Sequence, residues 1–330
     1  MNMWLTLLAN AGLIILAGTQ LSKNAERISR GLGLSTAWAG ALLLSIATSL
    51  PELVTSRRAV IIGAPDLAGG NIFGSNLFNL ALLVLIDLFY RRGIFTARRK
   101  RGLVLTAIFS IFLTGISIGA MVMKLPFRAG WVGLDTILIL VVYLLGSGII
   151  MDQEKEKVDD VKRADKKSFS RPPYETVRGM VFFLLAAAVI IFAGTRLTDT
   201  ADLIAAETGL GKTLAGFLFI AAATSLPELV ATVAAVRMGF PEMAIGNVFG
   251  SNFFNILIFF FTDFFYRQGL LMSVLSPQNI ITAIMVIILT TVAIIGLLIP
   301  GRRRVVGLSV PSMIILAGYL ATFIFLFQTG

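Results

Sequence analysis

The octapeptide ATSLPELV at Ala47–Val54 occurs a second time, unchanged, at Ala223–Val230. The decapeptide GNIFGSNLFN at Gly70–Asn79 returns as GNVFGSNFFN at Gly246–Asn255. Both matches share a single offset, because position 47 corresponds to position 223 and position 70 to position 246. The chain is therefore organised as two copies of one unit, and whatever these motifs do is done twice.

Composition indicates that lipid surrounds most of the side chains. Hydrophobic residues occupy 57% of the 330 positions and the mean hydropathy is +0.88, well above the values of soluble domains. The chain has no cysteine and no histidine, which excludes disulfides, thiolate metal sites and imidazole acid–base chemistry. We expect a membrane protein that is not an enzyme, needs no cofactor and holds any ion through oxygen atoms.

Ten apolar segments are long enough to cross a bilayer, since a spanning helix needs about 20 such residues. They are residues 3–21, 36–62, 67–90, 102–123, 130–150, 177–198, 211–237, 241–266, 278–299 and 306–327. Five lie in each half, so the second copy would enter the membrane with the opposite orientation, as in many secondary transporters. We expect an all-α integral membrane protein with two inverted-topology five-helix repeats, residues 1–150 and 177–330, joined by a cytoplasmic linker at 151–176.

The net charge of +10 reflects where the basic residues gather. They concentrate in the predicted linker and in alternate loops, as at Arg98–Arg101 and Arg302–Arg304. By the positive-inside rule these segments are cytoplasmic, which puts both termini outside. We expect a multi-pass protein of the cell (inner) membrane that functions as a monomer, with membrane lipid and ions as partners and no nucleic acid.

One ionisable residue recurs near the middle of a predicted span in each half, as Glu52 and Glu228. Charged side chains inside a membrane are costly, so a repeated pair is a functional-site hypothesis by default. A threonine precedes each glutamate by four residues, at Thr48 and Thr224. This spacing puts hydroxyl and carboxylate on one helical face.

A proline stands directly before each glutamate, at Pro51 and Pro227. Proline cannot donate to the carbonyl four residues back and opens that turn of a helix. The freed carbonyls, of Ala47 and Ala223, are tolerated at membrane depth where they line a cavity or bind an ion. A proline alone would indicate a kink, but joined to a repeated glutamate it favours an ion site.

Polar residues recur at every fourth position in the second motif and form one stripe on each helix. The stripes are Asn71, Ser75 and Asn79 in the first half and Asn247, Ser251 and Asn255 in the second. We expect the second and third residues of each stripe to be ion ligands. Asn76 and Asn252 lie off the stripes, and we expect them to form hydrogen bonds between helices.

Carboxylates, hydroxyls, amides and backbone carbonyls make an all-oxygen set that suits a hard cation such as Ca²⁺ or Na⁺. Two carboxylates in a low dielectric repel each other strongly when the site is empty. One cation would therefore leave only when another replaces it, which is an exchange mechanism. Two alternatives stay open: a Ca²⁺/H⁺ antiporter, in which protons replace Na⁺, and a cation channel.

Asp87 and Asp263, the other intramembrane acids, also occupy equivalent positions of the two halves. Each is followed four residues later by an arginine, Arg91 or Arg267. We expect an i,i+4 ion pair that anchors the end of a span. This pattern is typical of a helix end rather than of an ion site.

With both motifs present twice, the chain resembles the calcium/cation antiporter superfamily and, within it, the prokaryotic-type sodium/calcium exchangers with two alpha repeats. The resemblance implies secondary active exchange of Ca²⁺ for Na⁺ by alternating access, with Glu52 and Glu228 as calcium ligands. It further implies flanking sodium sites and a central position lined by two asparagines. The residues for the sodium sites would be Thr48, Ser49, Ser75, Thr224, Ser225 and Ser251, and those lining the centre would be Asn79 and Asn255.

The chain departs from the family pattern at three positions. Ala47 and Ala223 stand where the family usually has glycine, and Asn255 stands where some members have aspartate. The missing carboxylate argues against potassium cotransport. No Gly-Asn-x-x-Glu motif, which marks the cation/proton branch, is present.

Overall fold

The structure is a computed structural model that describes residues 3–90, 101–164, 173–208, 224–299, 304–305 and 307–329. Several sequence-based expectations fall outside these residues, among them the start of the seventh predicted span, the carbonyl of Ala223 and most of the arginine-rich loop around 91–100. Contacts within the chain define two compact units, and each unit takes segments from both halves of the sequence. The first is Met1–Pro51 with Ile149–Val248, and the second is Glu52–Gly148 with Phe249–Gly330.

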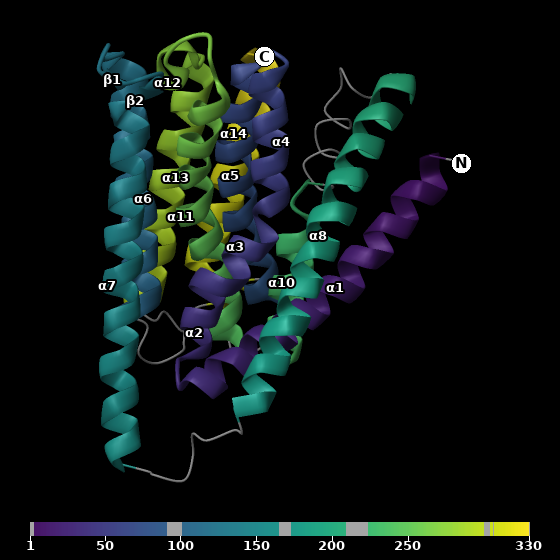
Figure 1. Cartoon of the computed structure of the whole chain (residues 1–330), viewed down its shortest axis with the longest axis vertical. Helices are drawn as coiled ribbons and strands as arrows, with labels where there is room; N and C mark the ends of the chain where they lie inside the picture. Colours follow the sequence, from purple (N-terminus) through teal and green to yellow (C-terminus); the bar gives the residue numbers. More distant parts are fainter. Residues whose placement is uncertain are drawn as a thin grey trace. The chain divides into compact units, whose positions relative to one another are not determined.

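The first unit is built around two long helices that cross the motif helices. Its elements are α1 (Met3–Leu32), α2 (Thr36–Trp38), the π-helix η1 (Ala39–Leu44), α3 (Ser45–Thr48), the end of α7 (Leu134–Ala164) from Ile149, α8 (Pro173–Thr208), α10 (Leu226–Arg237) and the start of α11 (Pro241–Phe265). Helices α1 and α8 lie side by side and antiparallel (Figure 1). Apolar residues near Ile14 and Ala193 form the core between them.

Two glycines at equivalent positions of α1 and α8 allow close packing on the motif helices. A Cβ atom added to Gly18 would lie 2.8 Å from Cγ1 of Val230 in α10. A Cβ atom added to Gly194 would lie 2.9 Å from Cγ of Pro51. Both distances are shorter than carbon atoms tolerate, so only glycine fits at these two contacts.

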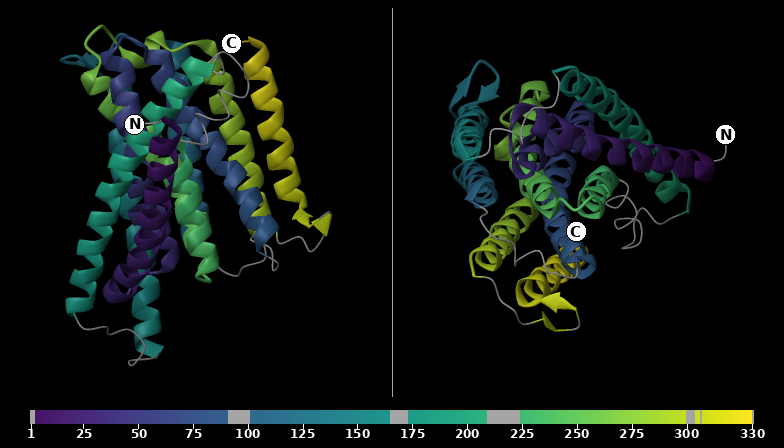
Figure 2. Two further views of the ribbon diagram at one scale, coloured as in Figure 1. Left: turned by 90° about the vertical axis from the view of Figure 1, so that its right-hand side faces the viewer. Right: turned by 90° about the horizontal axis from the view of Figure 1, so that it is seen from below.

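The second unit contains the remaining helices and two short hairpins. Its elements are α4 (Leu50–Ile61), α5 (Pro65–Phe89), α6 (Arg101–Met123), β1 (Arg128–Ala129), β2 (Val132–Gly133), α7 (Leu134–Ala164, to Gly148), α11 from Phe249, α12 (Leu271–Val274), α13 (Pro277–Leu298), β3 (Arg304–Val305), β4 (Leu308–Ser309) and α14 (Val310–Thr329). Helix α13 packs against α5, α6 and α14, and Figure 2 shows it beside the yellow α14. Each hairpin is antiparallel and leads directly into a helix.

Asp263, near the end of α11, is fully buried and binds the start of α7. Its Oδ2 accepts hydrogen bonds from the Gly133 amide at 2.8 Å and from Thr136 Oγ1 at 2.7 Å. Its Oδ1 accepts one from the Leu271 amide at 3.1 Å. A carboxylate at a helix N-terminus satisfies amides that have no partner inside the helix.

Asp87, at the equivalent position of the first half, makes the equivalent contacts with the start of α14. Its Oδ2 accepts hydrogen bonds from the Ser309 amide and from Ser312 Oγ, both at 2.8 Å. The repeat offset that relates Asp87 to Asp263 also relates Gly133 to Ser309 and Thr136 to Ser312. The aspartate of each half therefore caps a helix of the other half.

The expected ion pair between Asp263 and Arg267 is wrong. Within the described residues, the Asp263 carboxylate is occupied by the donors at the start of α7 and α12. The guanidinium of Arg267 lies instead over the Trp131 ring, 3.8 Å from its centroid. Asp87 has an arginine of the other half nearby, with Arg304 Nη2 3.5 Å from its Oδ1, and Arg91 is outside the described residues.

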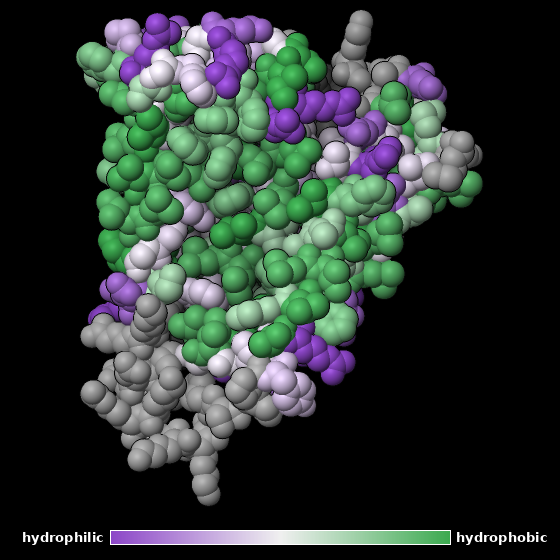
Figure 3. Space-filling model, viewed as in Figure 1, coloured by the Kyte–Doolittle hydropathy of each residue, from purple (hydrophilic) through white to green (hydrophobic). Residues whose placement is uncertain are grey.

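Eight helices of the described residues are long and apolar enough to cross a membrane, by length and composition. They are Met3–Leu32, Thr36–Ile61, Pro65–Leu88, Arg101–Met123, Leu134–Gln153, Tyr174–Ala201, Pro241–Phe265 and Pro277–Leu298. Val310–Leu326 is a shorter apolar helix, and of the seventh predicted span only α10 and the residues just before it are described. Figure 3 shows mainly hydrophobic side chains over α6 and α7.

The predicted linker is more helical than its composition indicated. Helix α7 continues through residue 164 and α8 begins at Pro173. Both ends of the segment 151–176 are therefore extensions of membrane helices, because charged residues such as those after Met151 propagate a helix well once a long apolar segment has nucleated it.

Candidate cation-binding site

Each glutamate motif breaks its helix at the serine two residues before the proline. Helix α3 ends at Thr48 and α4 begins at Leu50, with Ser49 at φ −90° and ψ 6°. Ser225 has nearly the same conformation, φ −95° and ψ 12°, directly before α10. The opened turn expected from the prolines is therefore present at equivalent places in both motifs.

The break puts each glutamate in the first turn of a new helix, Glu52 in α4 and Glu228 in α10. Helix N-termini carry a partial positive charge and unpaired amides, which stabilise a nearby carboxylate. Both side chains are 1% exposed. A buried acid pair at two helix starts is an arrangement that the sequence alone did not reveal.

In the first unit, the two motifs meet at Glu228. Ser49 Oγ, from the first motif, donates a hydrogen bond to Glu228 Oε1 at 3.0 Å. The other carboxylate oxygen, Oε2, accepts no hydrogen bond from any described residue. Thr48 is fully buried, and its hydroxyl lies 3.3 Å from the Ser45 carbonyl and 3.5 Å from Asn247 Oδ1.

The first residue of each polar stripe ties the stripe helix to the glutamate helix of its own half. In the second unit, Asn71 Nδ2 donates to Ser56 Oγ at 2.9 Å and to the Glu52 carbonyl at 3.3 Å. In the first unit, Asn247 Nδ2 donates to Thr232 Oγ1 at 3.0 Å.

Sequence reasoning missed the two acceptors of these bonds. Ser56 and Thr232 are hydroxyl residues four positions after the glutamates, at equivalent positions of the two halves. That equivalence, together with the i,i+4 spacing, was a signal that would have identified them.

Four asparagines form a two-fold network in the second unit. Asn76 Nδ2 donates to the Asn252 carbonyl at 3.3 Å, and Asn252 Nδ2 donates to the Asn76 carbonyl at 3.1 Å. Asn79 Nδ2 donates to Asn252 Oδ1 at 3.1 Å, and Asn255 Nδ2 donates to Asn76 Oδ1 at 3.0 Å. The prediction that Asn76 and Asn252 form hydrogen bonds between helices is confirmed.

This network leaves two amide oxygens without donors. Asn79 Oδ1 and Asn255 Oδ1 are buried and accept no hydrogen bond from the described residues. Ser251 Oγ is also buried and has no hydrogen-bond partner among these residues. Because the amide nitrogens of both asparagines are held, their oxygens have a fixed orientation. Buried oxygens with no donor are what a cation site requires, since an ion supplies the missing partner.

The ten predicted site residues are all buried, and they fall into two groups. The first unit holds Thr48, Ser49, Thr224, Ser225 and Glu228. The second unit holds Glu52, Ser75, Asn79, Ser251 and Asn255. Within the first group, Ser49 contacts Glu228. Within the second group, the asparagine network links Asn79 of α5 to α11 and Asn255 of α11 to α5.

The two groups offer only oxygen ligands and negative charge. A charged carboxylate is costly to bury in a membrane helix, so a hard cation would stabilise each group. No group of three or more acids that would hold a metal ion occurs among the described residues. The neutral oxygens of the two groups are ligands that hard cations accept beside carboxylates.

Several known proteins are similar to this chain. It is 27% identical to the sodium/calcium exchanger MaX1 of Methanosarcina acetivorans over 87% of this chain and 90% of that protein. It is 29% identical to the inner membrane protein YrbG of Escherichia coli over 74% of each chain. A solved structure of the sodium-calcium exchanger NCX_Mj, soaked with 10 mM Na⁺ and zero Ca²⁺, matches with a TM-score of 0.72 at 21% identity and 97% coverage of both chains, which shows a common fold.

The sequence also matches a family model. The model describes the sodium/calcium exchanger protein and matches residues 2–149 and 178–266, more than half of the chain. These ranges contain both glutamate motifs and both polar stripes. The chain therefore belongs to the sodium/calcium exchanger family of multi-pass membrane transporters.

Proposed function

We propose that the chain is a secondary active antiporter that exchanges Ca²⁺ for Na⁺ across the membrane by alternating access. The observation that carries the proposal is the repeated glutamate, buried in each half in the first turn of a helix that begins inside the motif. Discontinuous helices whose ends face the ion are the usual construction of ion sites in secondary transporters.

We infer from the repeat that the two glutamates serve one Ca²⁺ ion. Two carboxylates balance the charge of a divalent cation, and neutral oxygens complete the six to eight ligands that calcium prefers. Candidates for these neutral ligands are the amide oxygens of Asn79 and Asn255, whose orientation the asparagine network fixes. The hydroxyls of the same groups would hold Na⁺ when Ca²⁺ leaves, because sodium accepts neutral oxygen ligands.

The architecture we propose is ten transmembrane helices in two inverted five-helix repeats. Interactions that recur at equivalent positions of the two halves support it. The bonds from Asn71 to Ser56 and from Asn247 to Thr232 are one such pair. The caps made by the two buried aspartates are another.

The orientation in the membrane follows from charge. Most of the 28 basic residues lie in the segment 151–176 and in alternate loops. If these face the cytoplasm, both termini lie outside, by the positive-inside rule. The site needs no second chain, so we propose a monomer as the functional unit.

Replacing Glu52 or Glu228 by glutamine should nearly abolish exchange in a folded protein. We expect calcium flux to fall by more than about 100-fold, because removing one partner of a buried charge set costs about 3–5 kcal/mol. The measurement is calcium flux into proteoliposomes, with size-exclusion elution as the check on folding. Glu207→Gln, an exposed position on α8, should retain wild-type flux, and wild-type flux in a folded Glu228→Gln protein would refute the assignment.

Asn252→Ala should weaken calcium binding without stopping transport. The substitution removes the acceptor of Asn79 Nδ2 and lets the amide rotate, so we expect the half-saturating calcium concentration to rise about fivefold to tenfold. The maximal flux should change less. Asn10→Ala, which removes a bond to the Thr6 carbonyl, is the matched control. Equal half-saturating calcium concentrations in the two variants would show that Asn252 does not position Asn79.

Calcium uptake into sodium-loaded proteoliposomes at equal pH on both sides tests the coupling ion. We expect an outward sodium gradient to drive uptake without a proton or potassium gradient. Ser251→Ala should raise the half-saturating sodium concentration more than that of calcium, because the unpartnered Ser251 hydroxyl is a neutral ligand suited to sodium. Uptake that ignores sodium and follows an imposed proton gradient would assign the chain to Ca²⁺/H⁺ antiport, and uptake without any counter-ion would indicate a channel.

A further inference from the structure

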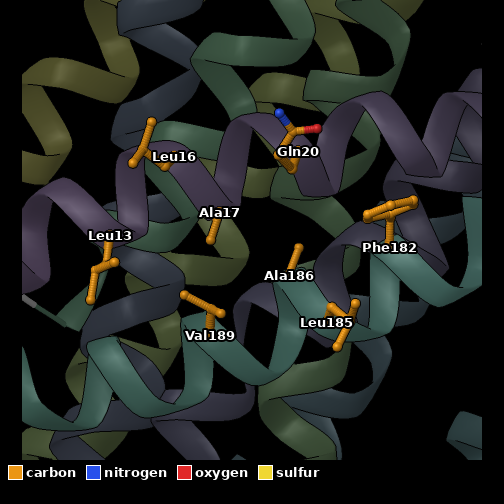
Figure 4. A pocket seen from close by; sticks show the side chains of 8 residues that line it. All are labelled: Leu13, Leu16, Ala17, Gln20, Phe182, Leu185, Ala186 and Val189. Atoms are coloured by element: carbon orange, nitrogen blue, oxygen red, sulfur yellow. The ribbon is translucent and has the colours of Figure 1, made fainter.

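A groove runs between α1 and α8 of the first unit, with a volume of about 320 Å³ (Figure 4). This volume lies at the lower end of the range of ligand pockets, roughly 300–1,000 Å³. Its lining is apolar except for one glutamine. The residues are Leu13, Leu16, Ala17, Gln20, Phe182, Leu185, Ala186 and Val189.

The groove walls face outward from the two helices. Leu16 is 68% exposed, Leu185 is 57% exposed and Phe182 is 45% exposed. Both helices are among the candidate membrane spans, so in a bilayer these side chains would face hydrocarbon. An acyl chain is the occupant whose chemistry matches such a wall.

One end of the groove is basic. Figure 4 shows Gln20 and Phe182 at the same end. Lys23 lies about one helical turn beyond Gln20 on α1, and Arg178 lies one turn beyond Phe182 on the antiparallel α8. The Arg178 guanidinium lies 5.6 Å from the centroid of the Phe182 ring.

Arg27, one turn after Lys23, completes the basic group where the two helices touch. A Cβ atom added to Gly179 of α8 would lie 3.4 Å from the Arg27 Cβ. Arg27 Nη1 donates to Asn24 Oδ1 at 3.1 Å, which leaves the other donors of its guanidinium for a ligand. All three basic side chains are exposed.

The acids near this group already have partners. Glu26 forms an ion pair with Arg30 on the same helix, so these two charges cancel. Glu175, about one turn from Arg178 on the side away from the groove, also has a partner, and it is one negative charge beside three positive charges. The three cations Lys23, Arg27 and Arg178 therefore present net positive charge at the end of an apolar groove.

We propose that this surface binds an anionic phospholipid of the bilayer, with one acyl chain in the groove and the phosphate on Lys23, Arg27 and Arg178. Arginine binds phosphate through paired N–H groups, and lysine adds a point charge. The apolar groove and the basic group are continuous along the same two helices. This matches a lipid, whose acyl chain and phosphate are joined, and not a soluble phosphate. The proposal is independent of the transported ion.

Lipid titration of the purified protein, followed by native mass spectrometry, tests the proposal. The probes are phosphatidylglycerol and phosphatidylcholine with identical acyl chains, and glycerol 3-phosphate, which has no acyl chain. We expect phosphatidylglycerol to bind the wild-type protein more tightly than phosphatidylcholine. Each of Lys23→Gln, Arg27→Gln and Arg178→Gln should lower phosphatidylglycerol affinity about fivefold and leave phosphatidylcholine unchanged.

Two further variants separate headgroup from chain. Arg196, on the same helix beyond the other end of the groove, also lies over a phenylalanine, 5.7 Å from the Phe192 ring centroid, so Arg196→Gln is the matched control and should keep the preference. Val189→Phe should narrow the groove and lower the affinity for both lipids. Equal binding of the two lipids by the wild-type protein would overturn the proposal. Displacement of phosphatidylglycerol by glycerol 3-phosphate at the same concentration would also overturn it. Both results come from the wild-type protein, so they do not depend on whether a variant folds.

Discussion

Polar atoms inside a membrane helix have no water to bond, so the chain itself must supply their partners. This constraint organises both units of the protein. In the second unit Asn71 bonds to Ser56, and in the first unit Asn247 bonds to Thr232. The buried aspartates obey the same constraint by capping helices. The same contacts therefore occur at a constant offset in the sequence.

Three of the residues in the proposed site depart from this constraint. Glu228 Oε2, Asn79 Oδ1 and Ser251 Oγ are buried and lack hydrogen bonds within the described residues. An unsatisfied buried polar group costs about 1–3 kcal/mol, which is too much to tolerate repeatedly without compensation. Under the function proposed above, a cation would supply the missing partner of such oxygens, and a second cation would replace the first when it leaves.

The sequence predicted features that depend on local spacing and missed features that depend on distant contacts. The glutamates, the helix breaks before Pro51 and Pro227, and the cross-linking role of Asn76 all follow from periodicity and the repeat. The partner of Asp263 cannot be predicted in this way, because Gly133 lies 130 residues away in the sequence. Arg267, at the i+4 position, suggested a local ion pair instead. Likewise, composition described the segment 151–176 as a linker, although α7 runs on to residue 164.

Crystallography with Ca²⁺ in the absence of Na⁺ would show whether Glu52 and Glu228 bind calcium, because the anomalous signal of the ion identifies its position. The account predicts one strong peak per chain with carboxylate oxygens of both Glu52 and Glu228 about 2.3–2.6 Å from it, and loss of that peak when Na⁺ replaces Ca²⁺. A peak at other acids, such as Asp135 and Asp263, with none at the two glutamates would contradict the account.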